Sequence, residues 1–189
     1  MSKHFLALVL AVGAATSVQA GDIDGLARTC NNCHGVNGVS AGPSMPSIGG
    51  LSEAYLKNIM MEWKSGARAS ATMTRLIKGY SDDQIADLAK YFGSKTWAPV
   101  VQKTSADVLK KGKDVTERCE TCHGDTGSKP DDELTPKLNG QWAKYLELEL
   151  MKYRDDGFKM VHKKMSKNAR KMDEADVATS AAFFGAQSK

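Results

Sequence analysis

The sequence predicts an all-α protein of two tandem domains. The first reason is an internal repeat, because the second half of the chain matches the first at an offset of 89 to 92 residues. The second is that apolar residues recur at helical spacing, as in Ile85, Leu88 and Phe92. The third is that no segment alternates apolar and polar residues as a half-buried strand would. A repeat of this length indicates two homologous domains rather than a solenoid.

Composition sets the class of protein. The chain has 189 residues, of which 41% are hydrophobic and 25% charged, as in soluble globular proteins. Disordered, fibrous and multispan membrane proteins are thereby excluded. The formal net charge of +4 falls to +3 once Lys3 is set aside with the leader described below. So small an excess predicts no nucleic-acid partner.

The first twenty residues read as a targeting segment. Lys3 precedes an apolar run over residues 5–15, and residues 18–20 (Val-Gln-Ala) fit a small-x-small cleavage site. We predict a signal peptide over residues 1–20, cleaved before Gly21. A membrane anchor is the alternative, but the run is shorter than the roughly 20 residues of a spanning helix. No other stretch could span a bilayer, so we expect an exported chain without a membrane span.

The first half predicts three helices. Asp22 and Asp24 can begin the first, which carries two cysteines near its end. Ser52 begins the second helix and Gly66 ends it. Residues 81–84 (Ser-Asp-Asp-Gln) form a capping box that begins the third, and Gly93 suits its C-cap.

The second half repeats this plan, with helices expected near residues 106–119, 141–155 and 173–184. The join lies near residues 96–99, where Pro99 interrupts any helix. We therefore predict an N-terminal domain over residues 21–97 and a C-terminal domain over residues 98–189, each of about three helices. Domains this small bury little core by themselves, so a bound apolar group would supply missing volume. The matching positions include His34 with His123, Pro46 with Pro136, Gly50 with Gly140, Tyr55 with Tyr145, Leu56 with Leu146 and Phe92 with Phe184.

All four cysteines lie in two C-x-x-C-H motifs, at residues 30–34 and 119–123. This spacing is typical of c-type heme attachment. Two thiols one helical turn apart can add to the two vinyl groups of one porphyrin, and the adjacent histidine can bind the iron. A thioredoxin-like motif would need alternating strands and helices, and a zinc site would not need a histidine after each pair. We predict two covalent hemes c, held by Cys30, Cys33, Cys119 and Cys122, with His34 and His123 as axial ligands.

Methionine is the expected partner of each histidine on the iron, because electron-transfer hemes commonly use a histidine and a methionine. In the first half we select Met73, which lies in a polar stretch before the last helix, over Met45, Met60 and Met61. In the second half four residues compete. They are Met160, His162, Met165 and Met172. We select Met165 because Met73 and Met165 each precede the matching phenylalanine by 19 residues.

Two further features carry weaker hypotheses. Pro46 and Pro136 lie at matching places after the two histidines, where a loop carbonyl could accept the imidazole N–H and orient the ring. Each could equally be a plain turn proline. Residues 159–171 contain six cations and no acidic residue. That segment is either a solvated loop, or a site that docks an acidic surface or pairs with heme propionates.

The chain resembles the diheme cytochrome c superfamily, and within it the cytochrome subunits of flavocytochrome c sulfide dehydrogenases. The resemblance is to two fused cytochrome c domains over nearly the whole mature chain. Its motifs are Cys-Asn-Asn-Cys-His-Gly at 30–35, Pro-Ser-Ile at 46–48, Lys-Ser-Gly at 64–66, Ile-Lys-Gly-Tyr-Ser at 77–81, Gly-Gln-Trp at 140–142 and Lys-Lys-Met at 163–165.

The resemblance implies a periplasmic heterodimer with a separate flavoprotein. That partner would carry FAD and oxidise sulfide, while this chain would take the electrons and pass them to a soluble cytochrome c. With both axial positions filled, the chain by itself would not be an enzyme. A free-standing diheme cytochrome c that serves a terminal oxidase is the alternative, and a diheme peroxidase is a third reading.

Overall fold

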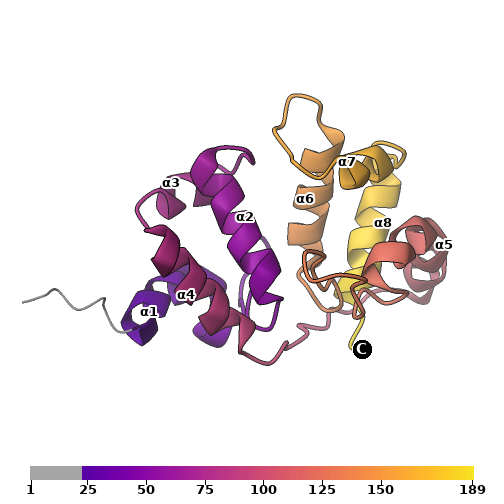
Figure 1. Cartoon of the computed structure of the whole chain (residues 1–189). Helices are drawn as coiled ribbons and strands as arrows, with labels where there is room; N and C mark the ends of the chain where they lie inside the picture. Colours follow the sequence, from indigo (N-terminus) through magenta and orange to yellow (C-terminus); the bar gives the residue numbers. More distant parts are fainter. Residues whose placement is uncertain (1–22) are drawn as a thin grey trace, which may run out of the picture.

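A computed structural model describes residues 23–189, so the predicted signal peptide and its cleavage site lie outside the described residues. The described residues form helices and loops without a strand, and Figure 1 shows them as two helical bundles side by side. The predicted all-α fold of two tandem domains is therefore confirmed. No helix between residues 23 and 189 has the length and apolarity to cross a membrane.

The two bundles have the same order of helices. The first contains α1 (Ile23–His34), the 3₁₀ turn η1 (Val36–Gly38), α2 (Glu53–Ser65), α3 (Met73–Ile77) and α4 (Asp82–Gly93). The second contains α5 (Ala106–His123), α6 (Ala143–Arg154), α7 (Lys163–Ala169) and α8 (Glu174–Gly185). Each bundle thus has the three predicted helices and one short helix, α3 or α7, that the sequence did not predict.

The predicted starts of α2 and α4 are confirmed by their caps, whereas Asp22, offered as a start of the first helix, lies outside the described residues. The Ser52 hydroxyl accepts from the Tyr55 N–H, and Gly66 ends α2 in the left-handed conformation at φ 73°. Ser81 and Gln84 form both bonds of the capping box. The predicted role of Gly93 was wrong, because Gly93 is the last residue of α4 and Ser94 is the C-cap. A Cβ on Gly93 would come within 3.2 Å of Glu53, so Gly93 lets the end of α4 pack on the start of α2.

Each bundle has a small apolar core. In the first, Ala27 of α1, residues of α2 and residues of α4 pack together with Leu51. In the second, Leu146 of α6 packs on Ala181, Phe183 and Phe184 of α8. Helix α5 approaches α8 closely because Gly112 presents no side chain, and a Cβ there would lie 2.5 Å from Phe183. Small cores like these leave the inner faces of the helices available to line a binding cavity.

An extended segment, residues 94–105, runs from α4 to α5 along the base of both bundles (Figure 1). Trp97 packs on the first core, while its indole N–H donates to the Asn139 carbonyl at 3.0 Å. Val100 and Gln102 donate their backbone N–H groups to carbonyls of the second bundle, at Gly140 and Gly185. The chain thus passes from contact with the first bundle at residue 97 to hydrogen bonds with the second at residue 100. This supports the predicted domain division at 97/98, which stays a prediction.

The two bundles are joined by buried hydrogen bonds. The Gln141 side chain accepts from the Ser47 N–H at 2.9 Å and donates to the Ser47 carbonyl at 2.8 Å. Trp142 donates its indole N–H to the Ser40 carbonyl at 3.0 Å. Because buried polar groups are costly when unpaired, these bonds fix how the two bundles face each other.

Candidate heme-binding sites

One continuous cavity of about 1230 Å³ extends through both bundles. This volume exceeds the roughly 300–1,000 Å³ of an ordinary small-molecule pocket. Both C-x-x-C-H motifs line it, as do apolar residues of the first bundle, such as Leu56 and Phe92, and of the second, such as Leu146 and Phe184. The fold therefore brings the two predicted heme sites into a single cavity.

In the first site, α1 ends at the motif histidine. His34 is 8% exposed, and its Nδ1 donates to the Pro46 carbonyl at 2.8 Å. A carbonyl can only accept, so this bond fixes the tautomer and leaves Nε2 with its lone pair. Burial lowers the pKa of His34, against an opposing effect of the Pro46 carbonyl. A neutral imidazole with a free Nε2 is the form that binds iron.

The second site repeats this geometry at the end of α5. His123 is 5% exposed, and its Nδ1 donates to the Pro136 carbonyl at 3.0 Å. Burial likewise lowers the pKa of His123, because it outweighs the opposing effects of the Pro136 carbonyl and nearby carboxylates. The predicted hydrogen bonds from the histidines to loop carbonyls at the two prolines are thus confirmed. Burial also raises the pKa of Cys119 to about 11, which keeps that thiol protonated at neutral pH.

The two predicted methionine ligands lie in the unpredicted short helices. Met73 is the first residue of α3, and Met165 is the third residue of α7. Both are half-buried and both line the cavity, at matching places in the two bundles. Met45, Met60 and Met172 line it too. The assignment of Met73 and Met165 as ligands therefore stays a prediction.

His162, the competing ligand, has a partner elsewhere. It is the N-cap residue of α7, and its Nε2 lies 3.5 Å from Glu62 Oε1 of α2. An imidazole held beside a carboxylate of the other bundle is turned to the interface, although it also lines the cavity. This contact supports Met165 over His162.

Polar groups within the cavity suit the carboxylates of a heme. The Trp63 indole N–H is buried without a protein partner in the described chain, and the Arg68 side chain lies nearby in the lining with 4% exposure. A buried N–H donor normally has an acceptor, and a propionate is one. An apolar cavity with two thiol pairs, two oriented histidines and buried donors therefore fits two hemes c.

Arg68 also joins the two bundles, a role that no sequence pattern indicated. Its guanidinium donates to the Tyr153 hydroxyl at 2.9 Å and to Glu149 Oε2 at 2.8 Å, both on α6. Burial alone would lower the pKa of Arg68, but Tyr153, Tyr55 and Glu149 outweigh it and raise that pKa, so the cation persists.

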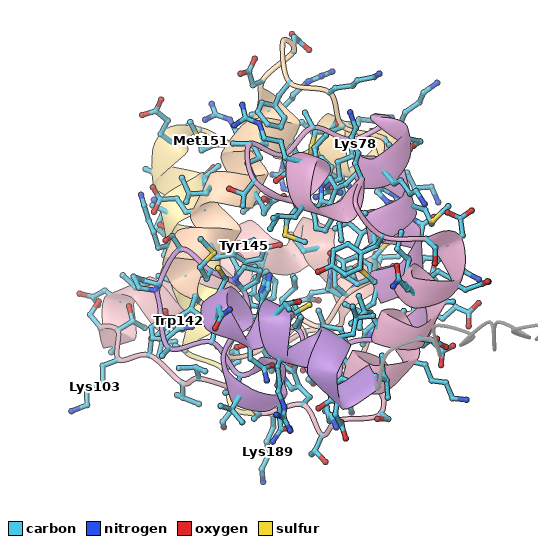
Figure 2. The ribbon with its side chains drawn as sticks, turned by 90° about the vertical axis from the view of Figure 1, so that its left-hand side faces the viewer. Lys78, Lys103, Trp142, Tyr145, Met151 and Lys189 are labelled. Carbon is cyan, nitrogen blue, oxygen red and sulfur yellow. The ribbon has the colours of Figure 1, made fainter. Side chains whose placement is uncertain are left out.

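Two tyrosines complete this interface. Burial raises the pKa of Tyr55 and of Tyr145, which occupy matching positions in the repeat. Figure 2 shows Tyr145 near the centre of the view, and the charges that act on its pKa include Tyr55 and Arg68 of the first bundle. The repeated pair was visible in the sequence, but its place at the interface was not.

Comparison with known proteins agrees with this architecture. No protein-family model matches the chain. Cytochrome c4 of Azotobacter vinelandii is 30% identical over 213 aligned positions, which cover 97% of this chain and 98% of that protein. The cytochrome subunit of sulfide dehydrogenase from Chlorobaculum tepidum is 39% identical over 69 residues, or 36% of this chain and 62% of that protein.

A solved structure shows the same fold. Reduced recombinant cytochrome c4 from Pseudomonas stutzeri superposes with a TM-score of 0.75 at 26% identity, covering 89% of this chain and all of that one. The similarity spans both bundles, so it includes their arrangement as well as the fold of each.

Proposed function

Because the chain belongs to the cytochrome c4 family of diheme cytochromes c, we propose that it transfers electrons between two protein partners through one heme c in each domain. The observation that carries this proposal is the single cavity shared by both C-x-x-C-H motifs. Hemes held in one cavity can exchange electrons directly, so one partner can deliver an electron at one domain and another can remove it at the other.

The residues have the following roles in this proposal. Cys30 and Cys33 attach the first heme, and Cys119 and Cys122 attach the second. His34 and His123 bind the two irons, with their rings fixed by the carbonyls of Pro46 and Pro136. Met73 and Met165 complete the coordination. Bound heme c supplies a one-electron couple, and methionine ligation raises its potential.

The chain by itself is a carrier in this proposal rather than an enzyme. A histidine and a methionine at each iron leave no position for a substrate. The surrounding side chains exclude water and orient the rings, which are the contributions a protein makes to cofactor chemistry.

The first candidate setting is a free periplasmic carrier that serves a terminal oxidase. The similarity to cytochrome c4 over 97% of the chain supports it, because both domains take part. The predicted signal peptide supports export to the periplasm.

The second candidate is the setting that the sequence motifs placed first, namely the cytochrome subunit of a flavocytochrome c sulfide dehydrogenase. The 39% identity to the Chlorobaculum tepidum subunit over 69 residues supports it. The partner would then be an FAD-containing flavoprotein in a heterodimer, and a soluble cytochrome c would be the acceptor.

Purification of the native protein from the periplasm tests both the diheme assignment and the choice between the two candidate settings. Acid–acetone extraction should leave two hemes on each chain, and one heme or extractable heme would contradict the diheme assignment. A flavin-free species of about the chain's own mass, 20.4 kDa before processing, favours the free carrier. Co-elution of flavin with a second subunit favours the sulfide dehydrogenase.

A further inference from the structure

An apolar groove is open on the surface of the second domain. Its lining includes Leu148 and Met151 of α6 and Phe158 of the loop that follows. Leu148 is 39% exposed, Met151 36% and the neighbouring Val161 41%. Figure 2 shows Met151 at the edge of the molecule, away from the central Tyr145. Exposed apolar side chains gathered at one place are typical of a binding surface.

The groove adjoins the second heme site. Leu148, Lys152 and Phe158 line both the groove and the cavity. Val161 and Lys163 line the cavity immediately next to them. A protein seated on the groove would therefore lie directly beside the cavity that α7 and its Met165 also line.

Cations surround the groove. Helix α7 and its ends carry exposed cations and Arg170 itself lines the groove. The exposed cations of residues 159–171 are Lys159, Lys163, Lys164, Lys167, Arg170 and Lys171. Among the nearby carboxylates, Asp156 is paired with Arg170 at 2.6 Å, and Lys164 interacts with Asp132. Asp155 is an exposed carboxylate in the lining, so the positive excess comes from α7.

The matching surface of the first domain lacks this character. Residues 67–79 match residues 159–171 at an offset of 92, and they contain three cations, of which Arg68 is buried in the interface. Only Arg75 and Lys78 are exposed there. The basic surface is therefore a property of one domain and not of the repeated fold.

We propose that this surface, formed by Leu148, Met151, Phe158 and Val161 with the cations of α7, docks an acidic redox protein that exchanges electrons with the second heme. The inference rests on the proposed function, because it requires a heme in the second domain. An apolar centre supplies contact area, and a charged rim steers the approach of an oppositely charged partner. Charge complementarity thus identifies the occupant as an acidic protein.

The test compares two triple charge reversals in the full diheme protein. The first, Lys163→Glu, Lys167→Glu and Lys171→Glu, reverses the rim. The control, Lys103→Glu, Lys110→Glu and Lys113→Glu, makes the same change in net charge at exposed lysines on and before α5. Figure 2 shows Lys103 at the end of the molecule opposite Met151. The probe is oxidised plastocyanin, a small acidic copper protein, mixed with the fully reduced cytochrome in a stopped-flow instrument.

At low ionic strength the rim variant should react about 10- to 100-fold more slowly than the parent, and the control should change about threefold or less. Added salt should slow the parent and leave the rim variant nearly unchanged. The variant Met151→Ser should raise, a few-fold, the plastocyanin concentration at which the observed rate saturates, without altering the salt dependence of that rate. Equal slowing by both triples, or none by the rim variant, would overturn the proposal.

Heme content separates this inference from the proposed function. Each protein is first checked for two covalent hemes and for complete reduction by dithionite. A parent with fewer than two hemes contradicts the proposed function, whatever the docking result. Where the rim triple fails to retain both hemes, the neutral triple Lys163→Gln, Lys167→Gln and Lys171→Gln replaces it, with an expected slowing about half as large on a logarithmic scale.

Discussion

The two domains have one fold but different surroundings. Their histidines are held in the same way, by Nδ1 bonds of 2.8 and 3.0 Å to carbonyls of Pro46 and Pro136. Away from the two histidines, the repeat diverges. Leu51 of the first domain matches Gln141 of the second, and Trp63 matches Tyr153.

These differences have a common location. Gln141 and Tyr153 bond to the first domain, whereas Leu51 packs in a core and Trp63 faces the cavity. The repeat thus places two matching histidine sites in the chain, and positions at which the two halves differ form the interface between the domains. The geometry around the histidines is therefore shared by the two domains, whereas the interface groups and the basic groove belong to one domain or the other.

The largest effect is expected from removing one attachment site at a time. Cys119→Ser with Cys122→Ser should leave one covalent heme and an unstable second domain, whose apolar core is the smaller. Cys30→Ser with Cys33→Ser should leave one heme and a more stable remainder. Intact-protein mass gives the heme count, and calorimetry gives the unfolding temperatures. Equal unfolding temperatures in the two variants would contradict the expected difference in stability between the two domains.

Replacing the two predicted axial methionines should give the next largest effect. Met165→Ala should lower the potential of the second heme by on the order of 0.1 V, a fraction of the roughly 0.8 V range set by axial ligands. It should also open the sixth position and remove one methionine-to-iron charge-transfer band from the oxidised spectrum. Met73→Ala should do the same for the first heme.

His162→Ala is the matched control for these variants. It should change neither spin state nor ligation, because the imidazole is held beside Glu62. A high-spin second heme in His162→Ala, together with a low-spin one in Met165→Ala, would reverse the assignment.

Loss of the buried Arg68 cation should have a smaller effect than the changes above. Its effect should be specific to the interface between the domains. Arg68→Met leaves the Tyr153 hydroxyl without its partner and removes the guanidinium from Glu149, which keeps its pair with Lys152. Breaking a buried ion pair costs about 3–5 kcal/mol, and the remaining Lys152 pair should place this loss near the lower end of that range. Denaturant unfolding should show this loss and a separation into two transitions. The control Lys64→Met breaks the partly exposed pair with Asp82 and the bond from Lys64 Nζ to the Tyr80 carbonyl, for which we expect about 1–2 kcal/mol and a single transition.

The smallest effect is expected at Gln141. Gln141→Leu restores the residue of the first repeat and removes both bonds to the Ser47 backbone, at a cost of about 1–3 kcal/mol. Gln187→Leu removes one bond to Phe183 within the second domain and should cost about 1 kcal/mol or less. Urea unfolding measures both. A larger loss for Gln187→Leu would show that Gln141 does not hold the domains together.

Much of the fold and the core of each site followed from local chemistry. The capping box at Ser81, the cap at Ser52 and the helices after them depend on residues a few positions apart, so the sequence displays them directly. The heme motifs are local for the same reason. Helices α3 and α7 were missed because their five and seven residues are too few to establish an apolar face.

The interface could be decided only by the tertiary structure. Arg68 and Glu149 lie 81 residues apart, and Ser47 and Gln141 lie 94 apart. Nothing near an arginine in the chain indicates that it will be buried, since its desolvation is offset by partners that only folding supplies. The sequence by itself determined two helical domains and two heme attachment motifs, because those depend on neighbours. The shared cavity and the buried cation between the domains arise where distant segments meet, and only the packing of the two domains decided them. The basic segment 159–171 was visible in the sequence, but the apolar groove beside it required the fold of the second domain.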